Sequence, residues 1–287
     1  MIPGSFDYHR PESIDAAVSL LASLGDEARV VAGGHSLIPM MKLRMAVPEH
    51  LVDLQDIADL KGISVDGGTV TIGAMTTQTE LIASDALATA CPIIREASLQ
   101  IGDPQVRNVG TIGGNVANGD PGNDMPALMQ ALNADYILQG SSGTRDVAAR
   151  AFYEAAYFTA LEEGEILSAV RFTAPPSGHG FAYEKQKRKI GDYATAAAAV
   201  VLTMSGGTCE MASIALTNVG DTPLHAEGAA NAIVGTNLDE AALNTAAEVA
   251  MAITDPAEDG RGPAEFRTHV AGVMTRRAIE KAAARAS

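Results

Sequence analysis

Two glycine-rich segments carry residue types that could hold a charged ligand. The first is "AGGHS", residues 32–36, and the second is "TIGGN", residues 111–115. Glycine has no Cβ, so its backbone can come close to a ligand, and successive N–H groups at the start of a helix attract negative charge. Each segment alone could be an ordinary turn. Two of them in one chain indicate a site for a phosphate or pyrophosphate group.

Polar side chains gather around the second segment, in "NVGTIGGNVANGDPGNDMP", residues 108–126. Thr111, Asn115 and Asp124 offer hydroxyl, amide and carboxylate groups suited to the sugar hydroxyls and ring edges of a cofactor. We interpret Asn118 and Asn123 as residues that stabilise turns through local hydrogen bonds. We expect residues 102–124 to form a long loop without regular structure, and such loops inside a compact domain are usually functional.

Other common kinds of site have no support in this sequence. It contains no G-x-G-x-x-G after a strand, no G-x-x-x-x-G-K-[ST] and no H-E-x-x-H, which excludes the usual Rossmann, P-loop and zincin signatures. Cys91 and Cys209 are its two cysteines, too few to ligate an iron-sulfur cluster or a structural zinc. We therefore expect no metal and no catalytic side chain in this chain, and we interpret both thiols as buried.

The elements around the first segment can be predicted from hydrophobic spacing. "PESIDAAVSLLASLGD" is typical of a helix with Ser13 as its N-cap and Gly25 at its end. "ARVVAGG" then indicates a buried strand, "HSLIPMMKLRMA" a short helix and "HLVDL" a second strand. This order places the glycines where a strand gives way to a helix.

The remaining elements follow the same signals. "GGTVTIGA", "DYILQG" and "GEILSAVRF" indicate strands, and Thr77 with Glu80 forms a candidate capping box before helices that extend to Leu99. Residues 175–178 are the best linker candidate. Beyond them, "TAAAAVVLTM" and "EMASIALTNV" predict a hairpin, followed by two helices. The last helix is basic, which suits solubility, the helix dipole or contact with an acidic partner.

The bulk properties limit the class of protein. The chain has 287 residues, is 47% hydrophobic and carries a formal net charge of −15. That length favours two or more domains, and that charge argues against nucleic acid as a partner. The apolar runs fall short of the roughly 20 residues that span a bilayer, and residues 1–15 lack the pattern of a secretory signal. We therefore expect a soluble cytoplasmic protein.

Taken together, the motifs resemble a known family. "AGGHS" and "TIGGN", with Gly119–Asp120, Asp124 and "KIGDYA" at 189–194, are similar to the FAD-binding medium subunits of molybdenum hydroxylases, and most of all to those of aerobic carbon monoxide dehydrogenases. The resemblance covers nearly the whole chain. It implies an α+β fold: a two-lobed FAD-binding module of the vanillyl-alcohol-oxidase type, residues 1–56 and 57–176, and then a C-terminal α+β domain, residues 177–287, with an antiparallel sheet and helices.

The resemblance also implies a set of residues that bind FAD without a covalent bond. Those expected at the pyrophosphate are Ala32, Gly33, Gly34, His35, Ser36, Thr111, Ile112, Gly113, Gly114 and Asn115. Asp124 would lie near sugar hydroxyls and Lys185 near the flavin, while Ile101, Ile166, Leu167 and Tyr193 would line its ring.

Alternatives stay open for several of these residues. The apolar ones would equally suit core packing, and Tyr193 could be a half-exposed aromatic residue. Lys185 belongs to a cluster with Lys187, Arg188 and Lys189, which could be a solvated face or could bind phosphate, reduced flavin or an acidic subunit. His35 could instead bind FAD covalently, as in some flavoproteins of the wider fold superfamily.

The function that the resemblance implies is electron transfer within an oxidoreductase that converts CO and water to CO2. Electrons would pass from a molybdenum-pterin cofactor on a large subunit, through 2Fe-2S clusters on a small subunit, to FAD on this chain, and then to a quinone or cytochrome. It further implies a dimer of heterotrimers and association with the inner face of the cytoplasmic membrane through the complex. The alternatives are another molybdenum hydroxylase acting on a purine or N-heterocycle, a self-contained flavin oxidase, and an assembly subunit without flavin.

Overall fold

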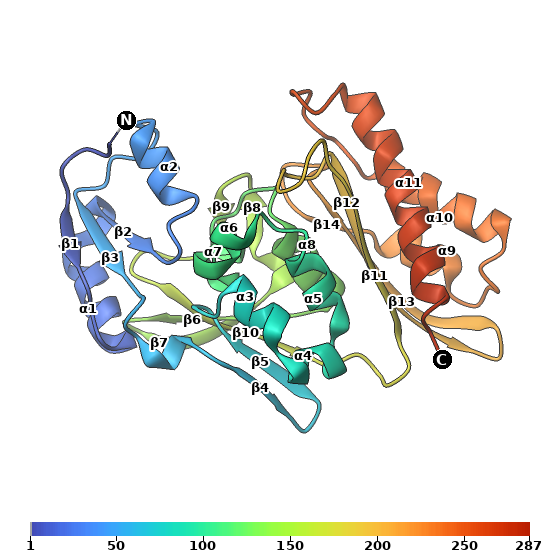
Figure 1. Ribbon diagram of the computed structural model, residues 1–287, viewed down its shortest axis with the longest axis horizontal. Helices are drawn as coiled ribbons and strands as arrows, with labels where there is room; N and C mark the ends of the chain where they lie inside the picture. Colours follow the sequence, from blue (N-terminus) through green and yellow to red (C-terminus); the bar gives the residue numbers. More distant parts are fainter. Residues whose placement is uncertain (1) are drawn as a thin grey trace.

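The computed structural model describes residues 2–287, which form three parts in a row (Figure 1). The first part contains β1 (Asp7–His9), α1 (Ile14–Leu24), β2 (Ala28–Val31), α2 (Leu37–Lys42) and β3 (His50–Asp53). Its strands are parallel, in the order β1-β3-β2. The hydroxyl of Ser13 caps α1 and Gly25 ends it, so both predicted boundaries are confirmed. Strand β2 stops immediately before the first glycine segment, as the sequence predicted.

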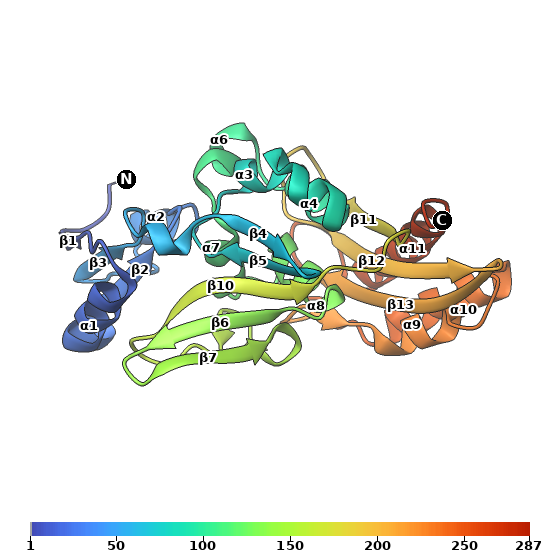
Figure 2. The same ribbon diagram turned by 90° about the horizontal axis from the view of Figure 1, so that it is seen from below.

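The middle part is built on a five-stranded antiparallel sheet. Its strands are β4 (Ile63–Asp66), β5 (Thr69–Gly73), β6 (Asp135–Gly140), β7 (Gly143–Ala148) and β10 (Ile166–Thr173), in the order β4-β5-β10-β6-β7. Its helices are α3 (Gln78–Ala83), α4 (Asp85–Ala90), α5 (Pro92–Ser98), α6 (Pro104–Val109), α7 (Ile112–Ala117) and α8 (Asp124–Ala131). A small hairpin joins β8 (Tyr153–Ala155) to β9 (Phe158–Thr159). Figure 2 shows α3, α4 and α6 on one side of the sheet.

The expectation of a long irregular loop over residues 102–124 is wrong, because α6 and α7 lie within it. Each of these short helices has a side-chain cap. Asp103 accepts a hydrogen bond from the Val106 N–H at 3.0 Å, and Thr111 accepts one from the Gly114 N–H at 3.0 Å. Asp and Thr at N-cap positions satisfy backbone donors that the helix itself leaves unpaired. These two capping residues are local signals of helix formation in a segment whose amino-acid composition is typical of a loop.

The C-terminal part packs helices on one face of a second antiparallel sheet (Figure 1). Its strands β11 (Gly180–Gln186), β12 (Ala196–Ser205), β13 (Thr208–Thr217) and β14 (Leu224–His225) lie side by side in that order. Its helices are α9 (Glu227–Ile233), α10 (Glu240–Ala252) and α11 (Ala264–Ala283). The predicted hairpin is confirmed, with its turn between β12 and β13.

Strand β12 is buried on both faces, which explains its run of small apolar residues. Ala197 and Ala199 belong to the core shared with the middle part, whereas Ala196 and Ala198 belong to the core beneath the helices. Successive residues of a strand point to opposite faces, so a strand between two cores is apolar throughout. The sheet therefore connects the middle part to the C-terminal helices.

Ion pairs tie the last helix to the middle part. The carboxylate of Glu96 on α5 accepts hydrogen bonds from Lys281 at 3.1 Å and from Arg285 at 2.7 Å, and Lys281 also pairs with Glu184 on β11 at 2.7 Å. Arg276 pairs with Glu240 and Glu280. Several cations of the basic helix therefore find acidic partners within this chain. No helix in residues 2–287 is long and apolar enough to cross a bilayer.

Candidate functional site

A cavity of about 930 Å3 is bounded by all three parts of the chain. This volume is near the upper end for cofactor and ligand pockets in proteins. It brings together nearly all of the residues that the sequence suggested for cofactor binding, which are Ala32, Gly33, Gly34, His35, Ser36, Ile101, Thr111, Gly113, Gly114, Asn115, Asp124, Ile166, Leu167, Lys185 and Tyr193. These predicted residues span positions 32 to 193 and are thus up to 161 residues apart in the sequence.

Ile112 does not line the cavity. Its side chain is fully buried in the core of the middle part, and its backbone N–H donates to the Thr76 carbonyl at 3.0 Å. It lies at the first position of α7, where its side chain packs inward. The side chain of Ile112 therefore packs in the core, and a contact with a cofactor at this position would have to come from its backbone.

The two glycine segments reach the cavity because the chain packs closely behind them. A Cβ on Gly33 would lie 2.4 Å from the Val109 carbonyl oxygen, and one on Gly113 would lie 2.5 Å from the Cβ of Ala74. Neither distance is possible for a real side chain, so both positions require glycine. The sequence attributed these glycines to a close approach to ligand. At these two positions the structure shows that close contact within the chain itself requires them.

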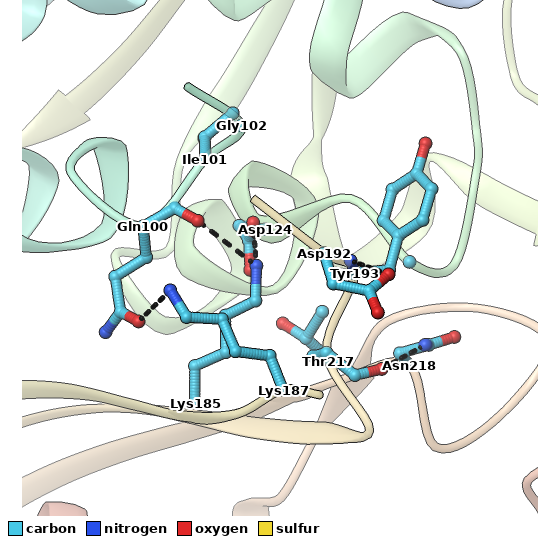
Figure 3. Close-up of polar contacts among 12 residues, drawn as sticks. Gln100, Ile101, Gly102, Asp124, Lys185, Lys187, Asp192, Tyr193, Thr217 and Asn218 are labelled. Carbon is cyan, nitrogen blue, oxygen red and sulfur yellow. Dashed lines mark hydrogen bonds and ion pairs between the residues drawn. The ribbon is translucent and has the colours of Figure 1, made fainter. Parts of the chain in front are cut away.

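A buried ion pair lies in the wall of the cavity (Figure 3). The Lys185 ammonium donates to the Asp124 carboxylate at 2.8 Å, and the side chains are 1% and 5% exposed. Lys185 also lies 3.5 Å from the Gln100 carbonyl oxygen. A buried charge is tolerated when it is paired and hydrogen-bonded. This pair therefore places two opposite charges beside the cavity without a large net field.

Tyr183 forms a hydrogen bond with the second carboxylate oxygen of Asp124. Its hydroxyl donates to Asp124 at 2.5 Å and lies 3.3 Å from the Thr217 hydroxyl. Burial raises the pKa of Tyr183 well above its usual value, and the negative charge of Asp124 raises it further, so the phenol keeps its proton. Tyr183 and Lys185 are two residues apart on β11 and thus share one face of the strand. The sequence interpretation missed Tyr183, because its partner Asp124 lies 59 positions earlier in the chain.

The rest of the basic cluster differs from Lys185. Lys187 donates to the Gln100 side-chain oxygen at 3.1 Å, and burial together with the nearby charge of Lys185 lowers the pKa of Lys187. Arg188 is exposed and pairs with Asp192 at 2.9 Å. Of the four cations, Lys185 is the one that lines the cavity.

Tyr193 is 40% exposed and lies apart from the ion pair in Figure 3. A Cβ added to Gly122 would be 2.9 Å from its ring, so the ring lies against that backbone. The Arg261 guanidinium carbon is 5.6 Å from the ring centroid. Burial raises the pKa of Tyr193, and the charge of Asp120 adds to the effect, so the ring is neutral. It can serve as a flat, uncharged wall for an aromatic ligand.

Two amide side chains at the cavity have unused hydrogen-bonding atoms. Both amide atoms of Gln78 and the amide nitrogen of Asn118 are buried and have no hydrogen-bond partner within residues 2–287, and both residues line the cavity. Native proteins leave few buried polar groups unpaired. A ligand with phosphate oxygens and sugar hydroxyls would satisfy such groups, so the residues present fit FAD.

These amides were missed or set aside on sequence grounds. On sequence grounds no role is predicted for Gln78, and Asn118 is expected to stabilise a turn. Asn123 was also interpreted as a turn residue, and its amide donates to the Asn115 carbonyl at 2.8 Å. That bond spans eight residues, and Asn123 itself lines the cavity, so its role in a turn stays a prediction.

Comparison with known families and proteins adds independent information. Residues 4–175 match the family described as the FAD binding domain in molybdopterin dehydrogenase, and residues 181–282 match the CO dehydrogenase flavoprotein C-terminal domain. The chain belongs to this family of flavoproteins. The two matched segments lie on either side of residues 176–180.

Individual members of the family align over the full length. The chain is 68% identical to the carbon monoxide dehydrogenase medium chain of Afipia carboxidovorans, covering 100% of this chain and 99% of the relative. It is 34% identical to the glyceraldehyde dehydrogenase medium chain of Sulfolobus acidocaldarius, covering 99% and 100%. A crystal structure of the cyanide-inactivated Cu,Mo-CO dehydrogenase contains a chain that superposes with a TM-score of 0.99 at 68% identity, and the match covers 100% of both chains. The expected α+β fold, with its C-terminal antiparallel sheet, is confirmed.

Proposed function

We propose that this chain is the FAD-carrying medium subunit of a molybdenum-containing carbon monoxide dehydrogenase. The observation that carries the proposal is the full-length match to a carbon monoxide dehydrogenase medium chain, in both sequence and structure. The cavity supports it, because both glycine segments and the Lys185–Asp124 pair line one space large enough for a dinucleotide.

Within that cavity, each group of residues has a proposed task. The glycine segments at 32–36 and 111–115 would hold the pyrophosphate of FAD through backbone and hydroxyl groups. Asp124 would accept from a sugar hydroxyl, and Lys185 would face the flavin with its positive charge. Ile101, Ile166, Leu167 and Tyr193 would enclose the ring. FAD would be bound without a covalent bond, with His35 beside it.

The chemistry at this site would be electron transfer. FAD can accept electrons one at a time and release them in pairs, and the protein supplies its position and electrostatic surroundings. The two cysteines of this chain are buried and far apart in sequence, and burial raises the pKa of Cys91 to about 12. Iron-sulfur clusters and the molybdenum centre would therefore belong to partner subunits. The complex would also contain a small and a large subunit and would form a dimer of heterotrimers. It would pass its electrons to a quinone or cytochrome and attach to the cytoplasmic membrane.

A second candidate keeps the same cofactor and changes the substrate of the complex. The glyceraldehyde dehydrogenase medium chain shares a third of its residues with this chain over its full length. The medium chain fold thus serves complexes with different substrates. The higher identity to the carbon monoxide dehydrogenase chain favours CO.

The test is to purify the complex natively through this chain and to record its visible spectrum anaerobically before and after adding CO. We expect flavin and iron-sulfur absorption that bleaches with CO. Bleaching with glyceraldehyde and not with CO would support the second candidate. A yellow chain that turns over without partner subunits would instead favour a self-contained oxidase, and a colourless complex would contradict the flavin assignment.

A further inference from the structure

Gln78 is a buried amide whose hydrogen-bonding capacity the chain does not use. The residue is 1% exposed, and neither its Nε2 nor its Oε1 has a partner within residues 2–287. It lines the cavity of the proposed cofactor site. Amide groups buried without partners are costly, so natural sequences keep them mainly where something else completes the bonds.

The position of Gln78 is fixed by the backbone around it. Its N–H donates to the Gly110 carbonyl at 2.9 Å. A second hydrogen bond between the same two segments joins the Ile112 N–H to the Thr76 carbonyl at 3.0 Å. Thr77 and Glu80 form a complete capping box on either side of it. The side chain therefore projects from a backbone that is held in place at several points.

Gln78 also lies at the meeting point of the two glycine segments. The carbonyl that accepts its N–H belongs to Gly110, and the Cα of Gly110 lies 2.8 Å from the position that a Cβ on Gly33 would occupy. The backbone of Gln78 is therefore anchored where the first segment touches the residues that precede the second. Gln78 is also the residue of α3 that lines the cavity.

We propose that Gln78 is an FAD-binding residue whose Nε2 donates to the pyrophosphate and whose Oε1 accepts from a sugar hydroxyl of the same molecule. This inference rests on the proposed function, because it needs FAD in this cavity. An amide suits the position since it provides one donor group and one acceptor group on a single planar unit. FAD would then supply the hydrogen-bond partners that the chain itself does not give to the Gln78 amide.

A matched control exists in the same part of the chain. Gln130 is also buried, and its Oε1 likewise has no partner within the described residues. Its Nε2 donates to the Ala149 carbonyl at 3.4 Å, and it is not among the residues that line the cavity. Gln78→Leu and Gln130→Leu therefore remove comparable buried amides, one at the cavity and one away from it.

The experiment uses the natively purified complex with each variant chain. The rate of FAD release is followed by the fluorescence of the freed cofactor, and the melting temperature of the complex is measured after FAD has been removed. For Gln78→Leu we expect FAD release at least tenfold faster and a melting temperature of the FAD-free form that is unchanged or higher, because an unpaired polar group is gone. For Gln130→Leu we expect wild-type FAD release.

A third variant tests the phosphate assignment. Gln78→Glu replaces the donor with a carboxylate, and its repulsion of a pyrophosphate should make FAD release faster than in Gln78→Leu. Equal release from these two variants would overturn the pyrophosphate contact. Wild-type release from Gln78→Leu, or a loss of FAD that accompanies a lower melting temperature of the FAD-free form, would overturn the proposal for Gln78. A wild-type complex that contains no FAD would instead refute the proposed function itself.

Discussion

Replacing Lys185 with methionine should destabilise the protein strongly, because it removes one half of a buried ion pair. Methionine keeps much of the length and apolar volume of the side chain but carries no charge. Asp124 would retain the hydrogen bond from Tyr183 and lose its only cationic partner within residues 2–287. The variant therefore leaves a carboxylate with an uncompensated charge in the interior.

The size of the expected loss of stability follows from the burial of the ion pair. Both side chains are 5% exposed or less, so little solvent is available to replace the lost ammonium. Breaking a buried pair by removing one partner costs about 3–5 kcal/mol, and removing both charges is often close to neutral. We expect a loss of this size for Lys185→Met. The double variant Asp124→Asn with Lys185→Met should recover most of it, since no charge is then buried.

Urea unfolding of the FAD-free chain measures these differences in the free energy of unfolding. The comparison requires that the dependence of this free energy on urea concentration is the same for all variants. Arg171→Met supplies the control, because Arg171 and Asp146 form a pair that is 39% and 45% exposed. Exposed ion pairs of that kind contribute about 0–1 kcal/mol to the free energy of unfolding. A Lys185→Met loss no larger than that of Arg171→Met, or a double variant less stable than Lys185→Met, would refute the view that charge compensation governs this site.

Further predictions concern the glycine contact, the contact between the middle and C-terminal parts, and the bond to FAD. Gly33→Val should reduce FAD content to background and cost about 1–3 kcal/mol of stability, because its Cβ would meet the Val109 carbonyl at 2.4 Å; FAD content and urea unfolding check both effects. Although burial raises the pKa of Glu96, the hydrogen bonds from the Tyr183 N–H, Arg285 and Lys281 leave it below its usual value. Glu96 therefore adds stability above its unfolded pKa and loses it as the pH falls through the lower folded value, so Glu96→Gln should flatten the acid limb of a stability profile. Acid precipitation should release FAD into the supernatant; FAD that stays with the protein would indicate a covalent bond at His35.

Much of the fold could be predicted because its signals are local. Ser13, Gly25 and the Thr77–Glu80 box set helix boundaries through hydrogen bonds between residues a few positions apart. The glycines of the β12–β13 turn act in the same way. The helices within residues 102–124 were missed because Gly, Asn and Asp dominate the composition there, and the caps at Asp103 and Thr111 outweigh that composition.

The site was predictable to a lesser extent. The resemblance placed Asp124 and Lys185 near a cofactor, and the structure shows that they form a pair across 61 positions of sequence. Tyr183 and Gln78 emerge from tertiary contacts, since neither a buried hydroxyl bound to a distant carboxylate nor an unpaired amide leaves a mark in local spacing. Ile112 shows the converse, because it lies inside a binding motif and packs in the core.

We propose that this chain carries FAD in the cavity between its three parts. The most direct measurement is the FAD content of the natively purified complex, determined per medium chain, for the wild type and for Gly114→Val, whose Cβ would lie 3.0 Å from the Thr111 hydroxyl and 3.4 Å from Ala32. We expect stoichiometric FAD in the wild type and little in a folded Gly114→Val complex. A wild-type complex without FAD, or a folded variant that retains all of it, would show that FAD does not bind in this cavity.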